Sequence, residues 1–133
     1  MTSVPREQAE AEVQAWLDKK KVFGSSRESN KDHVDTLIDS ICEGVLSLNQ
    51  ENWKFTHKLL FPFGDQIKVE KLDYYARLND KMLKPYLSGV KPNDADGRLL
   101  AHISALTTQP RAILEELDTA DKKIAFSIAV FFL

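Results

Sequence analysis

The sequence has few of the residues that build disulfide scaffolds, fibrous repeats or flexible tails. Its 133 residues include one cysteine, Cys42, five glycines and five prolines. A single cysteine cannot form an intrachain disulfide, and this is typical of a reducing compartment. So few glycines and prolines exclude a collagen-like or low-complexity chain. We therefore expect a cytoplasmic protein in which Cys42 is a core residue on a helix.

Long apolar runs are also missing. The longest covers residues 124–133, interrupted by Ser127, whereas a helix that crosses a bilayer needs about 20 apolar residues. The first residues, Met-Thr-Ser-Val-Pro-Arg, lack the basic and apolar regions of a secretory signal. The sequence thus predicts neither a membrane partner nor an export signal.

The chain has no excess of positive charge. It carries 18 Lys and Arg residues against 20 Asp and Glu residues, and phosphate binding needs clustered cations. The lysine run at 19–21 suits the negative end of a helix better than a phosphate. Aromatic and cationic residues alternate from Trp53 to Lys58, as in some single-strand binding surfaces. In a strand, however, Trp53 and Phe55 face one side and the lysines the other, so we expect a core face and no nucleic-acid partner.

What the sequence does have is 43% hydrophobic residues, enough for a core in one domain of this length. Apolar residues at helical spacing predict helices that begin near Pro5, Asp32, Asp73, Pro92, Pro110 and Thr119. The second is expected to extend to about Leu48, with Gly44 at a close helix crossing. The prediction is a mainly α domain of five to six helices, with an N-terminal helical arm at 1–24, a polar hinge at 25–31 and a helical domain at 32–133.

One segment of that domain changes period. Apolar and polar residues alternate at 53–59 and again at 67–70, and residues 63–66 have turn chemistry. This pattern predicts one antiparallel β-hairpin at about 53–70 with a single buried face. Because a lone hairpin is marginally stable in water, that face must be covered by the helices or by another chain.

The residues that carry chemistry are scattered. His33, His57 and His102 lie far apart, without the spacing of zinc ligands, so we expect satisfied structural histidines. The chain contains neither a Gly-x-Ser-x-Gly elbow nor a phosphate-binding glycine loop. Asp94 begins a stretch like a calcium loop, but the residues beyond Gly97 are not oxygen ligands, so it is expected to cap a helix. We predict no catalytic, cofactor-binding or metal residues, no small-molecule substrate and no enzyme activity.

The apolar residues are unevenly placed. The last ten residues are apolar almost all round a helix, which is typical of a segment buried in a core or in an interface. The first helix has only a thin apolar stripe. The C-terminal helix is thus either the last core element or a surface held by another chain. In the second case the partner-binding residues are Ile124, Phe126, Ile128, Phe131, Phe132, Leu133, Val13 and Trp16.

Four short stretches share a pattern with a known family. They are residues 67–72, 103–110, 113–121 and 129–133. The first is a short β segment; the second contains an "isoleucine-x-x-leucine-threonine" element at 103–107, and the third a "leucine-aspartate-x-x-aspartate" element at 117–121. In this order they resemble the tail assembly chaperones of contractile-tailed, Mu-like phages. The resemblance covers about residues 55–133, and residues 1–50 have no counterpart in it.

The resemblance implies a function without catalytic residues. Such a chaperone, in the host cytoplasm, binds and shields apolar helical segments of the tape-measure protein during tail assembly. The resemblance also implies contacts with other tail proteins, a homo-oligomer and a longer product made by ribosomal frameshifting.

A second hypothesis fits the same lack of catalytic residues. The chain would then be a small phage or bacterial interaction protein that binds and inhibits a host protein complex. Tyr74, Tyr75 and Tyr86 would be its interface anchors, since tyrosine is enriched at binding hot spots. The alternative is that these tyrosines pack on a helix of the domain itself.

Overall fold

The computed structural model describes residues 3–133, so residues 1 and 2 of the predicted N-terminal arm lie outside the described residues. The described part is mainly helical, as predicted, and it contains one antiparallel sheet. In chain order the elements are α1 (Arg6–Lys19), α2 (Gly24–Ser29), α3 (Lys31–Cys42), β1 (Leu46–Asn49), β2 (Lys54–Phe63), β3 (Val69–Asp73), α4 (Asp80–Leu83), η1 (Lys84–Leu87), α5 (Ala95–Thr107), α6 (Arg111–Leu114), α7 (Thr119–Ala129) and η2 (Val130–Phe132).

The sheet has three strands in the order β1-β2-β3, so the predicted hairpin is only part of it. β1 was missed because the second helix was expected to continue to Leu48. Instead α3 ends at Cys42, and Gly44 adopts a positive φ of 77°. The amide of Val45 donates to the carbonyl of Ser40 across this turn. Gly44 is therefore a helix-ending glycine, since only glycine takes this conformation at little cost, and not a helix-crossing residue.

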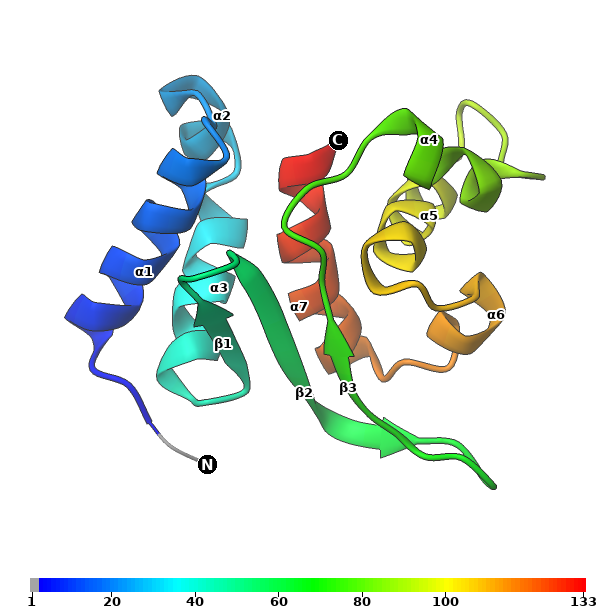
Figure 1. Ribbon diagram of the computed structural model, residues 1–133, viewed down its shortest axis with the longest axis horizontal. Coiled ribbons are helices and arrows are strands. Elements are labelled where there is room, and N and C mark those ends of the chain that lie inside the picture. Colours follow the sequence, from blue (N-terminus) through cyan, green and yellow to red (C-terminus); the bar gives the residue numbers. More distant parts are fainter. Residues whose placement is uncertain (1–2) are drawn as a thin grey trace.

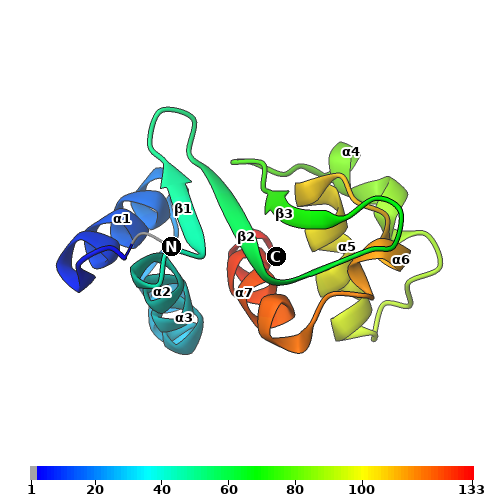
Figure 2. The same ribbon diagram turned by 90° about the horizontal axis from the view of Figure 1, so that it is seen from below.

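Helices cover one face of the sheet. Figure 1 shows α1 and α3 at one end of the molecule, α4, α5 and α6 at the other, and α7 between them. Figure 2 shows α3 and α7 on the same side of the sheet. The alternation predicted for β2 is confirmed, because Phe55, His57 and Leu59 are buried while Lys54 and Lys58 are exposed.

The predicted arm and hinge are parts of this one body. Val13 and Trp16 of α1 are buried in the same core as residues of α3, α5 and α7. The segment expected to be a hinge is instead the short helix α2, which Arg27 fastens to α1. Its guanidinium pairs with the Asp18 carboxylate at 2.8 Å and donates to the Val22 carbonyl at 3.0 Å. Polar composition indicated a flexible linker here, but one arginine provides the tertiary bonds that hold it.

The helix expected from Asp73 begins later. Asp73 is the last residue of β3, and the chain then runs along α5, where the Tyr75 amide donates to the Leu106 carbonyl at 2.9 Å. α4 begins at Asp80, where the Asn79 side chain accepts from the amide of Met82 and caps the helix. A small second cluster of Leu83, Ala101 and Ala105 packs this segment on α5. Among residues 3–133, no helix is both long and apolar enough to cross a membrane.

Candidate partner-binding site

Half of the eight predicted partner-binding residues are core residues. Val13, Trp16, Ile124 and Ile128 are 6% exposed or less. Phe126, Phe131 and Phe132 are half-buried and pack against that core, and Leu133 is exposed.

The apolar C-terminus thus covers its own domain. Trp16 is its main neighbour, with ring centroids 5.8 Å from Phe131 and 6.1 Å from Phe132. The predicted surface is corrected accordingly, because an all-round apolar helix is what a position between α3, α5 and β2 requires.

A buried polar network joins α7 to the sheet. The Asp121 carboxylate, fully buried, accepts from His57 Nε2 at 3.1 Å. On the other side of the imidazole, Nδ1 lies 3.3 Å from the Tyr74 hydroxyl. With neutral His57, the hydroxyl donates to Nδ1 and Nε2–H donates to the carboxylate, so every member is satisfied.

The same carboxylate fixes an irregularity in β2. Lys58 pairs with Lys71, but the next register pair is Phe63 with Val69, so residues 59–62 oppose Glu70 alone. A bulge of this kind leaves backbone amides without ladder partners. Asp121 accepts two of them, from Leu60 at 2.8 Å and from Phe61 at 3.0 Å. One buried aspartate therefore determines the shape of the outer half of β2.

Burial sets the protonation of this network. It lowers the pKa of His57, against the opposing attraction of Asp121. It also raises the pKa of Tyr74, and the Asp121 charge acts in the same direction. The neutral forms of both side chains are thereby favoured. All three side chains are buried, so the network is enclosed between α7 and the sheet.

Large apolar side chains are exposed in the bulge and in the turn beyond it. We call residues 60–69 the distal ribbon. Ile67 is 85% exposed, Phe61 56% and Leu60 43%, while Phe63 and Val69 are half-buried. Figure 1 shows this end of β2 and β3 projecting beyond the helices. Sequence reasoning missed this surface, although Leu-Leu-Phe-Pro breaks the alternation of the strand and Pro62 indicates an edge or a bulge.

A small recess adjoins the distal ribbon. We call it the acidic recess; it has a volume of about 220 Å³, and its lining residues are Asp39, Ser40, Glu43, Val45, Leu60 and Ile124. Val45, Leu60 and Ile124 make its apolar part, and two carboxylates stand among the rest. Ile124 is the one predicted partner-binding residue that lines it. The geometry suits one apolar side chain that has a basic neighbour.

The motifs that carry the family resemblance have local roles. Asp118 caps α7 by accepting from the Ala120 amide at 2.9 Å, and Asp121 is the network carboxylate. Ile103 and Leu106 are fully buried, and the Thr107 hydroxyl donates to the Ile103 carbonyl at 2.7 Å. Each motif thus fastens a helix to the body of the domain.

The other residues considered in the sequence also have local roles. His33 Nδ1 lies 2.9 Å from the Ser127 hydroxyl, and His102 Nδ1 lies 2.7 Å from the Arg98 carbonyl. Asp94 caps α5, as predicted, by accepting from the Gly97 amide. Cys42 is half-buried at the end of α3, so it is less enclosed than the core position predicted for it. Within residues 3–133, no group of three or more His, Cys, Asp or Glu side chains is placed to hold a metal ion.

Comparison of the chain with protein-family models, with curated proteins and with solved structures finds no match in any of the three.

Proposed function

We propose that this protein is a non-enzymatic chaperone of phage tail assembly that binds and shields apolar helical segments of the tape-measure protein in the host cytoplasm. The resemblance of residues 55–133 supports the proposal at the level of sequence. The observation that carries it is the distal ribbon, where Ile67, Phe61 and Leu60 each expose a large apolar side chain within one short segment. Exposed apolar surface marks interaction sites in soluble proteins when it is extensive, and the ribbon is the candidate for such a site here.

The ribbon is held ready for binding. Because Asp121 accepts from the amides of Leu60 and Phe61, the backbone of the bulge is anchored to α7 without a partner. A preorganised surface loses less conformational entropy when a partner binds, and this raises affinity. The apolar stripe of a partner helix would lie along the ribbon in this mode.

The acidic recess adds a second contact. An apolar side chain of the partner helix would enter between Leu60 and Ile124. Glu43 makes no ion pair within residues 3–133, whereas Asp39 pairs with Arg6 at 2.8 Å. A lysine or arginine of the partner, one helical turn from the inserted side chain, would therefore pair with Glu43.

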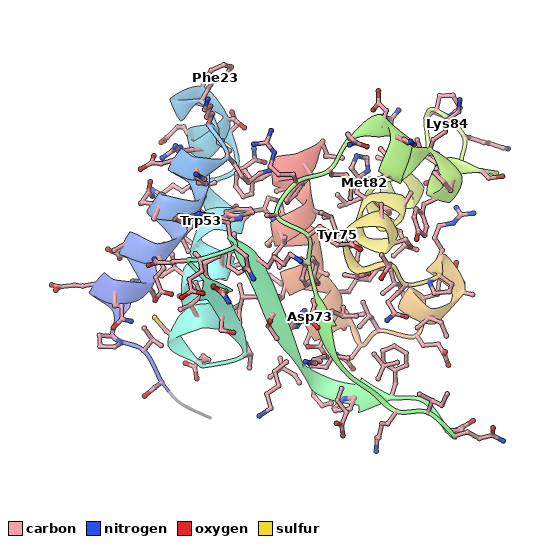
Figure 3. The ribbon with its side chains drawn as sticks, in the orientation of Figure 1. Phe23, Trp53, Asp73, Tyr75, Met82 and Lys84 are labelled. Carbon is pink, nitrogen blue, oxygen red and sulfur yellow. The ribbon has the colours of Figure 1, made fainter. Side chains whose placement is uncertain are left out.

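Co-expression with a tape-measure protein tests the proposal. The wild-type chain should increase the soluble yield of the tape-measure protein, and the double variant Phe61→Ser with Ile67→Ser should remove the increase. Phe23→Ser is the matched control, because Phe23 is 80% exposed but lies at the far end of the molecule, as Figure 3 shows. An unchanged yield with the wild-type chain, or an equal loss with Phe23→Ser, would contradict the proposal.

Self-association is part of the proposal, since apolar ribbons of two copies can cover each other when no partner is present. The same double variant should then shift a homo-oligomer toward monomer in sedimentation or light scattering.

The second hypothesis, an inhibitor of a host complex, is less well supported, because two of its three expected interface tyrosines are buried or half-buried. Tyr74 is buried in the network and Tyr86 is half-buried, so only Tyr75, 40% exposed, remains free for an interface. An affinity pull-down from host lysate separates the two. A host complex that is lost on Tyr75→Ala would favour the inhibitor, and enrichment of virion proteins alone would reject it.

A further inference from the structure

A second recess lies at the opposite end of β2 from the distal ribbon. We call it the Trp53 recess; its volume is about 240 Å³, and it is lined by Trp16, Lys19, Lys20, Asn52, Trp53, Ala76 and Arg77. Trp53 stands in the β1–β2 connection beside α1, as Figure 3 shows. The recess therefore combines an aromatic wall with three cationic side chains, two from the C-terminal end of α1 and its cap and one from the segment after β3.

The cations of this recess have no counter-charge. Lys19, Lys20 and Arg77 make no ion pair within residues 3–133. Their neighbours are aromatic: Lys20 Nζ lies 3.4 Å from the ring centre of Phe132, and Lys19 Nζ lies 6.0 Å from that of Trp53. Burial and the repulsion from Arg77 lower the pKa of Lys20 to about 8. An anion at the mouth would relieve this repulsion.

Trp53 has an unusual backbone. Its φ is 61°, in the left-handed region, where a bulky side chain is a genuine outlier. Such a conformation is held by the surrounding structure, and here the Trp53 amide donates to the Asn49 carbonyl at 2.6 Å. Backbone strain of this kind concentrates at binding and active sites. It places the indole of a half-buried tryptophan beside the three cations.

The size of the recess restricts what can fill it. Sites for drug-sized ligands have volumes of roughly 300–1,000 Å³, so this one suits a single side chain rather than a cofactor or nucleotide. Trp16 is 1% exposed, which leaves its ring face closed to base stacking. An apolar side chain would contact the half-buried Trp53 indole, and carboxylates on either side of it would reach the cations.

We infer that the Trp53 recess binds an acidic peptide segment of a partner protein, with one aromatic or large aliphatic side chain packed against the Trp53 indole and its flanking carboxylates paired with Lys19, Lys20 and Arg77. This site is separate from the distal ribbon, so it gives the protein a second contact of different chemistry. Its failure would leave the proposed function standing.

Intrinsic fluorescence tests the inference directly, because both tryptophans of the chain line the recess. The probe is the peptide acetyl-Gly-Asp-Glu-Phe-Glu-Asp-Gly-amide, which contains no tryptophan. We expect a saturable change in emission that weakens as salt is added, since salt screens exposed charges. Two companion peptides, with Phe replaced by Ser or with the acids replaced by lysines, should bind at least roughly tenfold more weakly.

Two variants with the same change in net charge complete the test. Arg77→Glu should weaken binding of the acidic peptide roughly tenfold, whereas Lys84→Glu, placed away from the recess in Figure 3, should leave it unchanged. If Arg77→Glu fails to fold, judged by its melting transition, Lys19→Glu replaces it. No saturable change with the acidic peptide, equal weakening by Lys84→Glu, or tighter binding of an eight-residue oligothymidylate would overturn the inference.

Discussion

Replacing Asp121 by alanine is the most informative perturbation of this fold. The change removes one carboxylate and leaves three donors without an acceptor: His57 Nε2 and the amides of Leu60 and Phe61. An unsatisfied buried donor costs about 1–3 kcal/mol. The two amides are only partly buried, so water can reach them and the lower end of that range applies to each. We expect Asp121→Ala to lower the free energy of unfolding by about 3–5 kcal/mol, which is the combined cost of these three unsatisfied donors.

Urea denaturation followed by circular dichroism measures this loss. Asp118→Ala is the matched control, because Asp118 belongs to the same motif but is an exposed helix cap, worth about 1 kcal/mol. Asp121→Asn keeps one acceptor oxygen and should fall between the two. Limited proteolysis should cut the distal ribbon of Asp121→Ala faster than that of the wild type. If Asp121→Ala and Asp118→Ala lose the same stability, the network does not hold the bulge as described.

Three further perturbations follow from other parts of the structure. Because burial lowers the pKa of His57, the unfolded chain binds its proton more readily than the native one. The free energy of unfolding should thus fall as pH drops below about 6.5. The His57→Gln variant should lack this contribution to the fall. If the free energies of unfolding of the variant and the wild type changed with pH in parallel, this prediction would be contradicted. Gly44→Ala should lower the free energy of unfolding, measured by urea denaturation, by about 1 kcal/mol, because φ is positive at this position. An unchanged free energy would show that the turn adjusts to accept alanine. Ile128→Ala should lower the free energy of unfolding by about 2–5 kcal/mol, because Ile128 of α7 is buried in the core. A change near zero, together with loss of partner binding, would instead support the C-terminal binding surface expected from the sequence.

The pattern of residues along the chain predicted those features that depend on interactions between residues close in sequence. The mainly helical character, the alternation of Phe55, His57 and Leu59 and the cap at Asp94 were all accessible from spacing and residue type. The helix end at Gly44 was also accessible, since glycine is the usual residue just beyond a helix. It was missed because Val45 and Leu48 continue a helical period by coincidence.

The surface was harder to predict than the elements. Whether an apolar segment faces its own core or a partner depends on what lies opposite it, and the neighbours of α7 come from α3, α5 and β2. In the same way, the exposure of Phe61 depends on a carboxylate far along the chain. The periodicity of apolar residues identifies only the apolar face of one segment. It cannot show what packs against α7 or which distant carboxylate binds the bulge.

The hydrogen bond from the Leu60 amide to the Asp121 carboxylate also affects when the distal ribbon can fold during synthesis of the chain. The two residues are separated by 61 positions. At about 5–20 residues per second, synthesis reaches Asp121 roughly 3–12 s after Leu60. During that interval the bulge has no acceptor for its amides, and the outer half of β2 cannot take its final shape. The apolar ribbon is thus completed only after α7 has emerged from the ribosome, which delays its capacity to bind until the rest of the domain can fold around it.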